Sequence, residues 1–264
     1  MITLGGFRGG INDARAERLA SKGIAALSLS YFGCPGLPST LQEIPLEYCE
    51  RAVDWAARHP AVDSSRVALW GVSRGAELAL ILGSLIPHRF AAIAATVPTS
   101  AIYGSIQNET PAWIYKGRPI APSAPFPMIQ FDPKLGTGPE WPLPLTPFFL
   151  EGMKDRAAFA ASKIQVEKFK CPLMLVSGED DQMWPSSLYA EQIKERLHER
   201  GSSISCVHYS YPNAGHSISS SEEIVEFHPV AKIWFAFGGT QRDNAIAKVD
   251  SWEKTVQFIR SWIY

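Results

Sequence analysis

The sequence predicts an α/β protein in which one mostly parallel sheet is covered by helices on both faces. Short apolar runs of strand length alternate with amphipathic segments of helix length, as expected for parallel strands joined by helical crossovers. The 264 residues, 46% of them hydrophobic, suffice to bury one sizeable core. We therefore expect residues 1–264 to form a single domain.

The first elements follow from capping and breaking residues. Asn12 can cap a helix that ends before Gly23, and Ile24–Ser30 then has the composition of a strand. Pro45 suits the first turn of a second helix, which must end just before Pro60.

The remaining regular elements are predicted from periodicity. They are strand Val67–Trp70, helix Arg74–Leu82, strand Ala91–Val97, strand Leu173–Ser177, a helix with Tyr189, Ile193 and Leu197 at four-residue spacing, strand Ile204–Tyr209 and a closing helix Trp252–Trp262. The pattern predicts no strand with comparable strength after Tyr209.

A stretch rich in proline and aromatic residues interrupts this alternation. From Pro111 to Pro147 it holds about half of the chain's 20 prolines, so it cannot form a long regular element. We expect residues 101–160 to form a cap-like insertion over a binding pocket, lined by Trp113, Phe131 and Trp141. The alternative is that these aromatic side chains fill the core.

Composition excludes several classes of protein. A formal net charge of −1 without a basic run argues against a nucleic-acid partner. Residues 1–10 do not resemble a signal peptide and no apolar run could span a membrane, so we expect a cytoplasmic protein. Cys34, Cys49, Cys171 and Cys206 lie far apart, which predicts reduced thiols, no metal site and no cofactor.

The motif Gly71-Val72-Ser73-Arg74-Gly75 lies between a predicted strand and a predicted helix. In that context it matches the nucleophile elbow of the α/β-hydrolase fold, where glycines allow a sharp turn and the serine hydroxyl is exposed beside a helix N-terminus. We interpret Ser73 as a catalytic nucleophile and the fold as that of an α/β-hydrolase.

A serine hydroxyl needs a base to take its proton. His216 follows the last predicted strand in a turn-rich loop, where this fold places its base. His228, further along the chain, is the only serious competitor among the six histidines. We favour His216.

The acid that orients the base must come between the serine and the histidine, in a loop after a strand. Glu179, Asp180 and Asp181 follow Gly178 in such a loop. Position favours Asp181 and leaves Asp180 as the alternative, while Glu179 fits a solvated loop.

A glycine-rich loop, residues 4–10, separates the first predicted strand from the first helix. This fold builds its oxyanion hole there, so we expect the amide of Gly6 or Phe7 to act together with that of Arg74. The loop lacks the glycine spacing of dinucleotide-binding or phosphate-binding motifs.

Together these motifs make nearly the whole chain similar to the C-terminal catalytic domain of the acyl-CoA thioesterase and bile acid-CoA:amino acid N-acyltransferase (BAAT) family. The resemblance rests on Gly9-Gly10, Leu46-Glu47-Tyr48, Gly71 to Leu78, Gly178 to Trp184, Tyr211-Pro212, Gly215-His216 and Ala247 to Trp252. It implies a triad of Ser73, Asp181 and His216, and so selects Asp181 over Asp180.

The resemblance implies a serine-dependent acyl thioester hydrolase that works through an acyl-enzyme, with an acyl-CoA or a carrier-bound acyl group as partner. Family members that transfer acyl groups to amino acids use cysteine as the nucleophile, whereas this sequence has Ser73. We therefore expect hydrolysis. Acyl transfer to an amine or alcohol, carboxylesterase activity and a catalytically silent binding module are the alternatives.

The family also carries an immunoglobulin-like domain and further strands before the catalytic domain, and we expect both to be absent here. Strand Ile24–Ser30 would then be a sheet edge with unpaired backbone groups. We expect the same edge of a second subunit to cover it in a two-fold homodimer. Coverage by Tyr31 and the loop after it, or a lost N-terminus, are the alternatives.

Overall fold

A six-stranded sheet forms the centre of the computed structural model, which describes all residues except 106–109, 128, 220–223, 229–230 and 264. Every neighbouring pair of its strands is parallel, and the order is β2-β1-β4-β5-β8-β9. The strands are β1 (Ile2–Leu4), β2 (Leu27–Leu29), β4 (Ala68–Val72), β5 (Ala92–Thr96), β8 (Leu173–Gly178) and β9 (Cys206–Tyr211). The predicted α/β class with a parallel sheet is confirmed.

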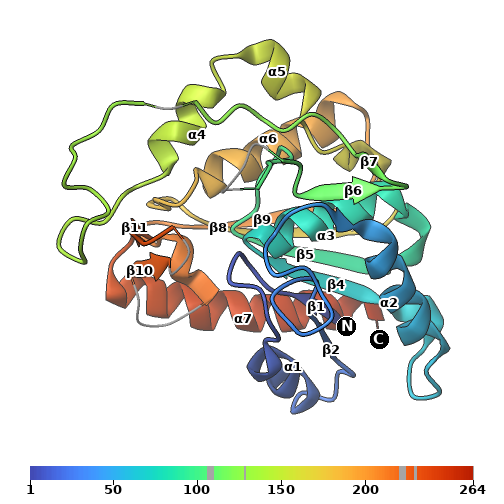
Figure 1. Cartoon of the computed structure of the whole chain (residues 1–264). Coiled ribbons are helices and arrows are strands. Elements are labelled where there is room, and N and C mark those ends of the chain that lie inside the picture. Colours follow the sequence, from blue (N-terminus) through green and yellow to red (C-terminus); the bar gives the residue numbers. More distant parts are fainter. Residues whose placement is uncertain (106–109, 128, 220–223, 229–230, 264) are drawn as a thin grey trace.

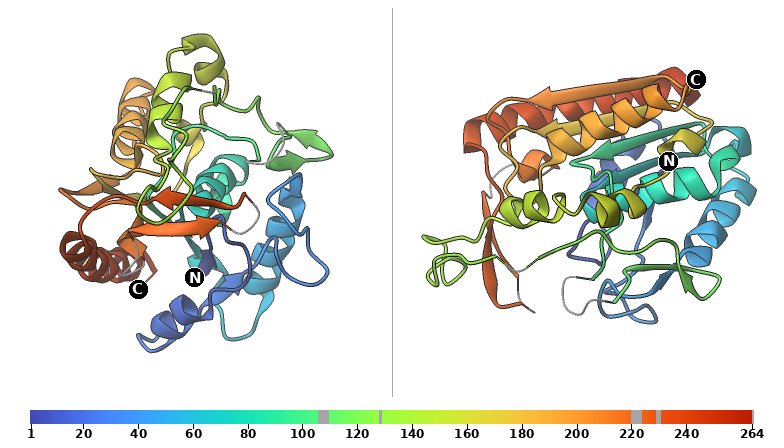
Figure 2. Two further views of the ribbon diagram at one scale, coloured as in Figure 1. Left: turned by 60° about the vertical axis from the view of Figure 1, so that its left-hand side comes forward. Right: turned by 90° about the horizontal axis from the view of Figure 1, so that it is seen from above.

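Helices cover both faces of this sheet, as predicted (Figures 1 and 2). One face carries α2 (Leu46–Arg58), α3 (Arg74–Leu85) and α6 (Ser186–Glu199), and the other carries α1 (Asp13–Ala20) and α7 (Gln241–Ile263). Successive strand residues point to opposite faces, so Leu69 joins the first core and Trp70 the second.

The first helix and the strand after it meet at a tight turn. The Asn12 side chain accepts from the amide of Arg15 at 3.3 Å, which confirms the predicted cap. The amide of Ile24 donates to Leu19 O at 3.1 Å, so this residue closes the end of α1 instead of starting a strand. For this reason β2 is shorter than the predicted Ile24–Ser30.

The last third of the chain departs most from the prediction. An antiparallel hairpin of β10 (Val225–His228) and β11 (Ile233–Ala236) follows β9, where no strand was predicted. Helix α7 begins at Gln241, well before the predicted start at Trp252. The Thr240 hydroxyl accepts from the amide of Asp243 at 3.0 Å and caps this earlier start.

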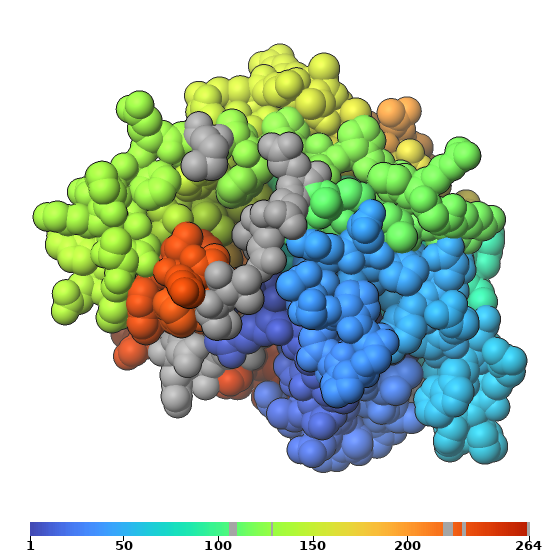
Figure 3. Space-filling model, viewed as in Figure 1, coloured from blue at the N-terminus to red at the C-terminus, as the bar shows by residue number. Residues whose placement is uncertain are grey.

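The predicted insertion contains only short elements. They are β6 (Trp113–Tyr115) and β7 (Arg118–Pro119), which form a small sheet with β3 (Ile44–Pro45), and the helices α4 (Thr146–Gly152) and α5 (Arg156–Ala161). The 3-10 helices η1 (Ser64–Arg66), η2 (Pro87–Arg89), η3 (Val166–Lys168) and η4 (His216–Ser219) complete the described elements. Figure 3 shows the insertion, in green to yellow-green, beside the orange-red hairpin at the surface.

The three aromatic residues predicted to line a pocket lie in different environments. Trp113 is 1% exposed and belongs to the same core as Leu69. Strand β6, which carries Trp113, pairs with β3, and the Trp113 indole N–H donates to Glu77 at 2.8 Å. Its assignment to a pocket wall is therefore wrong. Phe131 and Trp141 are 40% and 48% exposed, and Phe131 contacts Phe148 within the insertion.

Candidate active site

The turn at Ser73 has the geometry that the glycine motif predicts. Ser73 has φ 56° and ψ −122°, and its amide donates to Thr96 O on the neighbouring strand at 3.0 Å. A Cβ on Gly71 would lie 2.0 Å from Gly75 O, and one on Gly75 would lie 2.3 Å from Gly5 O. Both glycines are therefore required by close backbone packing, and the serine sits at the junction of β4 and α3.

Three side chains that are far apart in the sequence meet above this turn. His216 Nε2 lies 2.9 Å from Ser73 Oγ, and His216 Nδ1 lies 2.9 and 3.0 Å from the two oxygens of Asp181. All three residues are buried, with Ser73 only 6% exposed. The structure thus brings together the serine, histidine and acid that the sequence singled out, in the order that proton transfer requires.

The loop after β8 separates the roles of its two aspartates. Asp181 also accepts from the amides of Met183 and Trp184 at 3.0 and 3.2 Å, which fixes the carboxylate toward His216. Asp180 points away and accepts from the amide of Gly239 at 2.8 Å. Its side chain therefore joins two loops and does not orient the histidine.

The rings around His216 limit its movement. Trp184 and Phe237 stand edge-on to the imidazole, with ring centroids 5.4 and 5.6 Å away. The amide of His216 donates to Phe237 O at 2.7 Å. His228, the competing candidate, lies on β10, where its ring stacks on Phe7 and its Nδ1 accepts from the amide of Ala231.

The predicted oxyanion loop touches the serine. A Cβ on Gly6 would lie 3.2 Å from Ser73 Cβ and 3.6 Å from its Oγ. Within the described part of the chain, the amides of Gly6 and Phe7 donate to no acceptor. The amide of Arg74, at the start of α3, belongs to the first turn, where N–H groups have no intrahelical acceptor. Donors are thus available on both sides of Ser73.

A buried ion pair anchors the start of α3. Arg74 Nη1 lies 2.7 Å from Glu77 Oε2, and Arg74 Nη2 donates to the carbonyl oxygens of Tyr103 and Gly104 at 2.9 and 3.2 Å. Burial raises the pKa of the Glu77 carboxyl, and the adjacent Arg74 guanidinium opposes that shift. Glu77 lies within the motif Gly71 to Leu78, but the motif alone did not predict this ion pair.

Glycines that the sequence motifs did not single out also bring together the loop after β8, which carries Asp181, and the loop after β9, which carries His216. A Cβ on Gly178 would lie 2.2 Å from Ala214 O, one on Gly215 would lie 2.1 Å from Gly238 O, and one on Gly238 would lie 1.9 Å from Asp180 O. The main chains of these loops therefore pack directly against each other. The adjacent glycines Gly238 and Gly239, just before α7, are the sequence feature that could have predicted this close packing.

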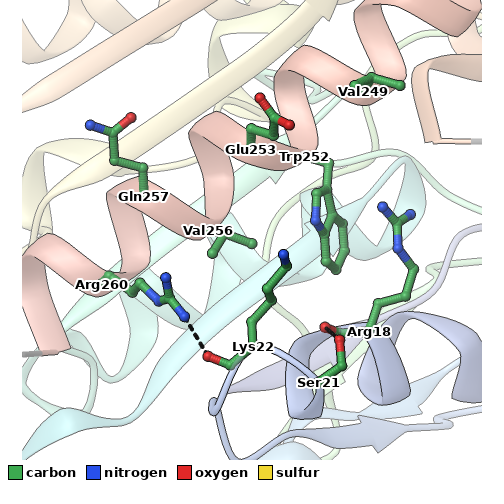
Figure 4. Close-up of a pocket in the computed structure, with 9 residues that line it drawn as sticks. All are labelled: Arg18, Ser21, Lys22, Val249, Trp252, Glu253, Val256, Gln257 and Arg260. Atoms are coloured by element: carbon green, nitrogen blue, oxygen red, sulfur yellow. Dashed lines mark hydrogen bonds between the residues drawn. The ribbon is translucent and has the colours of Figure 1, made fainter.

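A groove of about 430 Å³ lies elsewhere, between α1 and α7 (Figure 4). The groove is lined by Arg18, Ser21, Lys22, Val249, Trp252, Glu253, Val256, Gln257 and Arg260. None of these belongs to the serine site. In the described residues, no cluster of three His, Cys, Asp or Glu side chains could hold a metal ion, and no helix is long and apolar enough to cross a membrane.

Comparison with known proteins gives consistent matches. Residues 44–264 match the family described as BAAT / Acyl-CoA thioester hydrolase C terminal. The chain is 29% identical to acyl-coenzyme A thioesterase 2, mitochondrial, of Mus musculus, over 98% of this chain and 54% of that protein. It is 31% identical to human acyl-coenzyme A thioesterase 1, over 98% of this chain and 58% of that protein. The chain thus spans little more than half of each relative.

Among solved structures, a putative dienelactone hydrolase from Klebsiella pneumoniae is similar in fold. It has a TM-score of 0.59 and 14% sequence identity, with 98% of this chain and 85% of that chain covered. The predicted α/β-hydrolase fold is confirmed.

Proposed function

The chain belongs to the BAAT / acyl-CoA thioester hydrolase C-terminal family, and from that premise we propose that it is a serine-dependent acyl thioester hydrolase acting through an acyl-enzyme on Ser73. The observation that carries this proposal is the continuous contact of Ser73, His216 and Asp181, with 2.9 Å between Ser73 Oγ and His216 Nε2. Serine at the nucleophile position supports hydrolysis over transfer to an amino acid.

Acylation begins when Ser73 Oγ attacks the thioester carbonyl and gives its proton to His216 Nε2. The carbonyl oxygen becomes an oxyanion, which accepts hydrogen bonds from the amide of Arg74 and from that of Gly6 or Phe7. Each such donor typically stabilises the transition state by about 3–4 kcal/mol. Asp181 accepts from His216 Nδ1–H, which holds the imidazole in the required tautomer and stabilises its protonated form.

Collapse of the tetrahedral intermediate breaks the C–S bond, and the thiolate leaves with the proton held on His216. A water molecule then attacks the Ser73 ester while His216 takes its proton. The second collapse breaks the ester C–O bond, returns that proton to Ser73 Oγ and releases the carboxylic acid. The same three side chains therefore serve both halves of the reaction.

We propose an acyl-CoA as the substrate, because both thioesterases compared above carry acyl-coenzyme A in their names. A carrier-bound acyl group has the same thioester chemistry and is the alternative. We also propose a cytoplasmic location, although one of those relatives is named as mitochondrial. Cell fractionation tests that location directly.

We propose that residues 101–160 cap the acyl site from one side. Phe149 on α4 lies edge-on to Trp184, with centroids 5.9 Å apart, and Trp184 in turn contacts His216. These contacts connect the insertion to the base through one intermediate ring. Under this proposal Phe131 and Trp141 form the outer part of the acyl wall. Alanine at either position should then change chain-length preference more than it changes the melting temperature.

The proposed homodimer concerns β2, which lies at one end of the strand order and pairs with β1. An edge strand offers backbone N–H and C=O groups to a second strand. A second copy of the same edge would satisfy them in a two-fold arrangement. Light scattering over a range of concentrations tests this, and a monomer at every concentration would contradict it.

The proposed reaction is tested by intact-protein mass spectrometry after brief exposure to a panel of acyl-CoA thioesters. We expect one acyl adduct on Ser73, and no adduct with Ser73→Ala, whose turnover should fall by on the order of 10⁴ or more. Added glycine, taurine or glycerol should leave the free acid as the product. An acylated acceptor would favour transfer, and activity retained by Ser73→Ala would overturn the assignment.

A further inference from the structure

The hairpin of β10 and β11 contacts the oxyanion loop at two successive residues. Glu226 forms an ion pair with Arg8, and the ring of His228 stacks on Phe7 with centroids 5.5 Å apart and planes inclined by 18°. Glu226 and His228 are two positions apart on β10 and therefore point to the same side of the strand. That side of the hairpin faces the middle of the loop.

Phe7 lies in a row of rings that ends at the proposed base. Its ring stands edge-on to Phe237 with centroids 6.3 Å apart, and Phe237 stands edge-on to His216 at 5.6 Å. Offset and edge-on arrangements are the favoured geometries of aromatic pairs. The oxyanion loop and the base are thus both held by one aromatic row that includes His228, whose ring also stands edge-on to Phe235 with centroids 6.0 Å apart.

The two ends of the loop are held by other groups. The Tyr31 hydroxyl donates to Gly5 O at 2.5 Å, and the amide of Gly10 donates to Phe32 O at 2.9 Å. These bonds fix the loop where it leaves β1 and where it approaches α1. They do not reach Phe7, whose described ring contacts are with His228 and Phe237.

We propose that His228 is a positioning residue for the oxyanion loop: its ring, stacked on Phe7, keeps the donating amide of Gly6 or Phe7 directed at the carbonyl oxygen bound above Ser73. This inference rests on the proposed role of Ser73 as nucleophile. His228 touches no reacting group, and its contribution is the flat face of the ring, so another flat ring should replace it.

The chemical state of His228 agrees with this role. Burial lowers the pKa of its imidazole, and Glu226 on the same strand opposes that shift. The ring is therefore neutral at neutral pH and stacks as an aromatic group. Its Nδ1 is occupied by the amide of Ala231 at 3.0 Å, so this nitrogen is not available to act as a base.

The test compares His228→Ala with His228→Phe, with Phe227→Ala as the matched control. Phe227 is the neighbouring residue on β10, and its ring contacts Trp234 instead of the loop. We expect His228→Ala to lower kcat by roughly tenfold to a hundredfold, less than the complete loss of an oxyanion donor. KM should stay unchanged, His228→Phe should restore most of kcat, and Phe227→Ala should have little effect.

A second readout separates positioning from general loss of structure. A trifluoromethyl ketone forms a tetrahedral oxyanion on Ser73, and its affinity should fall in His228→Ala by the same factor as kcat. The affinity of the carboxylic acid product should not change. Three results would each overturn the inference. They are equal effects of His228→Ala and Phe227→Ala, a change in His228→Ala confined to KM, and failure of His228→Phe to restore activity.

The measurements use p-nitrophenyl acetate as well as an acyl-CoA, so that the two proposals can fail separately. If Ser73 hydrolyses the oxygen ester but no thioester, the proposed substrate class is wrong while the role of His228 is still measured. If a fluorophosphonate probe does not label Ser73, both proposals are overturned.

Discussion

The two sides of the proposed oxyanion site are held in place by different kinds of contact. On the helix side, the side chain of Arg74 is buried against Glu77 and is further bound by the carbonyl oxygens of Tyr103 and Gly104. On the loop side, Phe7 is held by the stacked ring of His228 and the edge-on ring of Phe237, and its neighbour Arg8 by an ion pair near the surface.

Because of this difference, loss of one contact on the helix side should destabilise the whole domain, whereas loss of one contact on the loop side should not. Breaking a buried ion pair by removing one partner typically costs about 3–5 kcal/mol, a large part of the stability of a domain. Removing one stacked ring costs about 0.5–1.5 kcal/mol beyond its burial. The helix-side donor is therefore fixed by the fold, whereas the loop-side donor can be moved without unfolding the protein.

The largest expected effect is on kcat and concerns the two aspartates after β8, of which Asp181 is buried and Asp180 is exposed. Asp181→Asn should lower kcat by on the order of 10⁴, because an amide there favours the wrong imidazole tautomer. Asp180→Asn keeps an oxygen for the amide of Gly239 and should retain turnover within a few fold. Steady-state kinetics on both variants measure this, and the reverse ranking would move the acid to Asp180.

Stability measurements on two glutamates compare the sides directly. Glu77→Gln leaves the buried Arg74 guanidinium without its charge partner and should lower the free energy of unfolding by about 3–5 kcal/mol. Glu226→Gln breaks the ion pair with the largely exposed Arg8 and should cost at most about 1 kcal/mol. Urea unfolding of both variants gives the two values. Equal losses would remove the distinction between the two sides.

A pair of glycines gives a smaller test on the backbone. Gly75→Ala places a Cβ 2.3 Å from Gly5 O and should destabilise the protein by about 3 kcal/mol or abolish folding. Gly5→Ala meets nothing within 4 Å and should change stability by less than about 0.5 kcal/mol. Thermal unfolding followed by circular dichroism compares them. A tolerated Gly75→Ala would contradict the close packing of the elbow against β1.

The smallest expected change in stability is at Ser73, the proposed nucleophile. Ser73 has a positive φ that glycine adopts without strain, and such conformations cost on the order of 1–3 kcal/mol in other residues. Ser73→Gly should therefore raise the free energy of unfolding by about 1 kcal/mol while abolishing turnover. Ser73→Ala keeps the strain and serves as the control. A less stable Ser73→Gly variant would mean that hydrogen bonding outweighs the strain.

The sequence predicted the parts of the site that depend on local chemistry and chain order. Glycines on both sides of Ser73 are typical of a nucleophile elbow, and the turn-rich loop before His216 is typical of the position of the base in this fold. The partner of Arg74 could not be predicted from local chemistry, because burial of a charged residue such as Glu77 depends on elements far away in the sequence.

Trp113 and the hairpin illustrate the same limit. An aromatic residue in a proline-rich stretch fits a pocket wall or a core equally well until its hydrogen-bond partner, Glu77, is known. The hairpin strands β10 and β11 are four residues each and lie outside the main sheet, so their pattern is too short to be distinctive. Helix α7 was predicted too short in part because its first turn, Gln241 to Asn244, is polar.

Because the backbone at Ser73 is strained, selection for stability favours glycine at this position, whereas selection for activity favours serine. A chain kept only for its structure, for example as a scaffold for a partner, would gain stability from any drift toward glycine at this position. Persistence of the serine despite that gain would point to continued use of its hydroxyl. We therefore expect glycine at the position of Ser73 in related chains that have lost the residue corresponding to Asp181 or to His216.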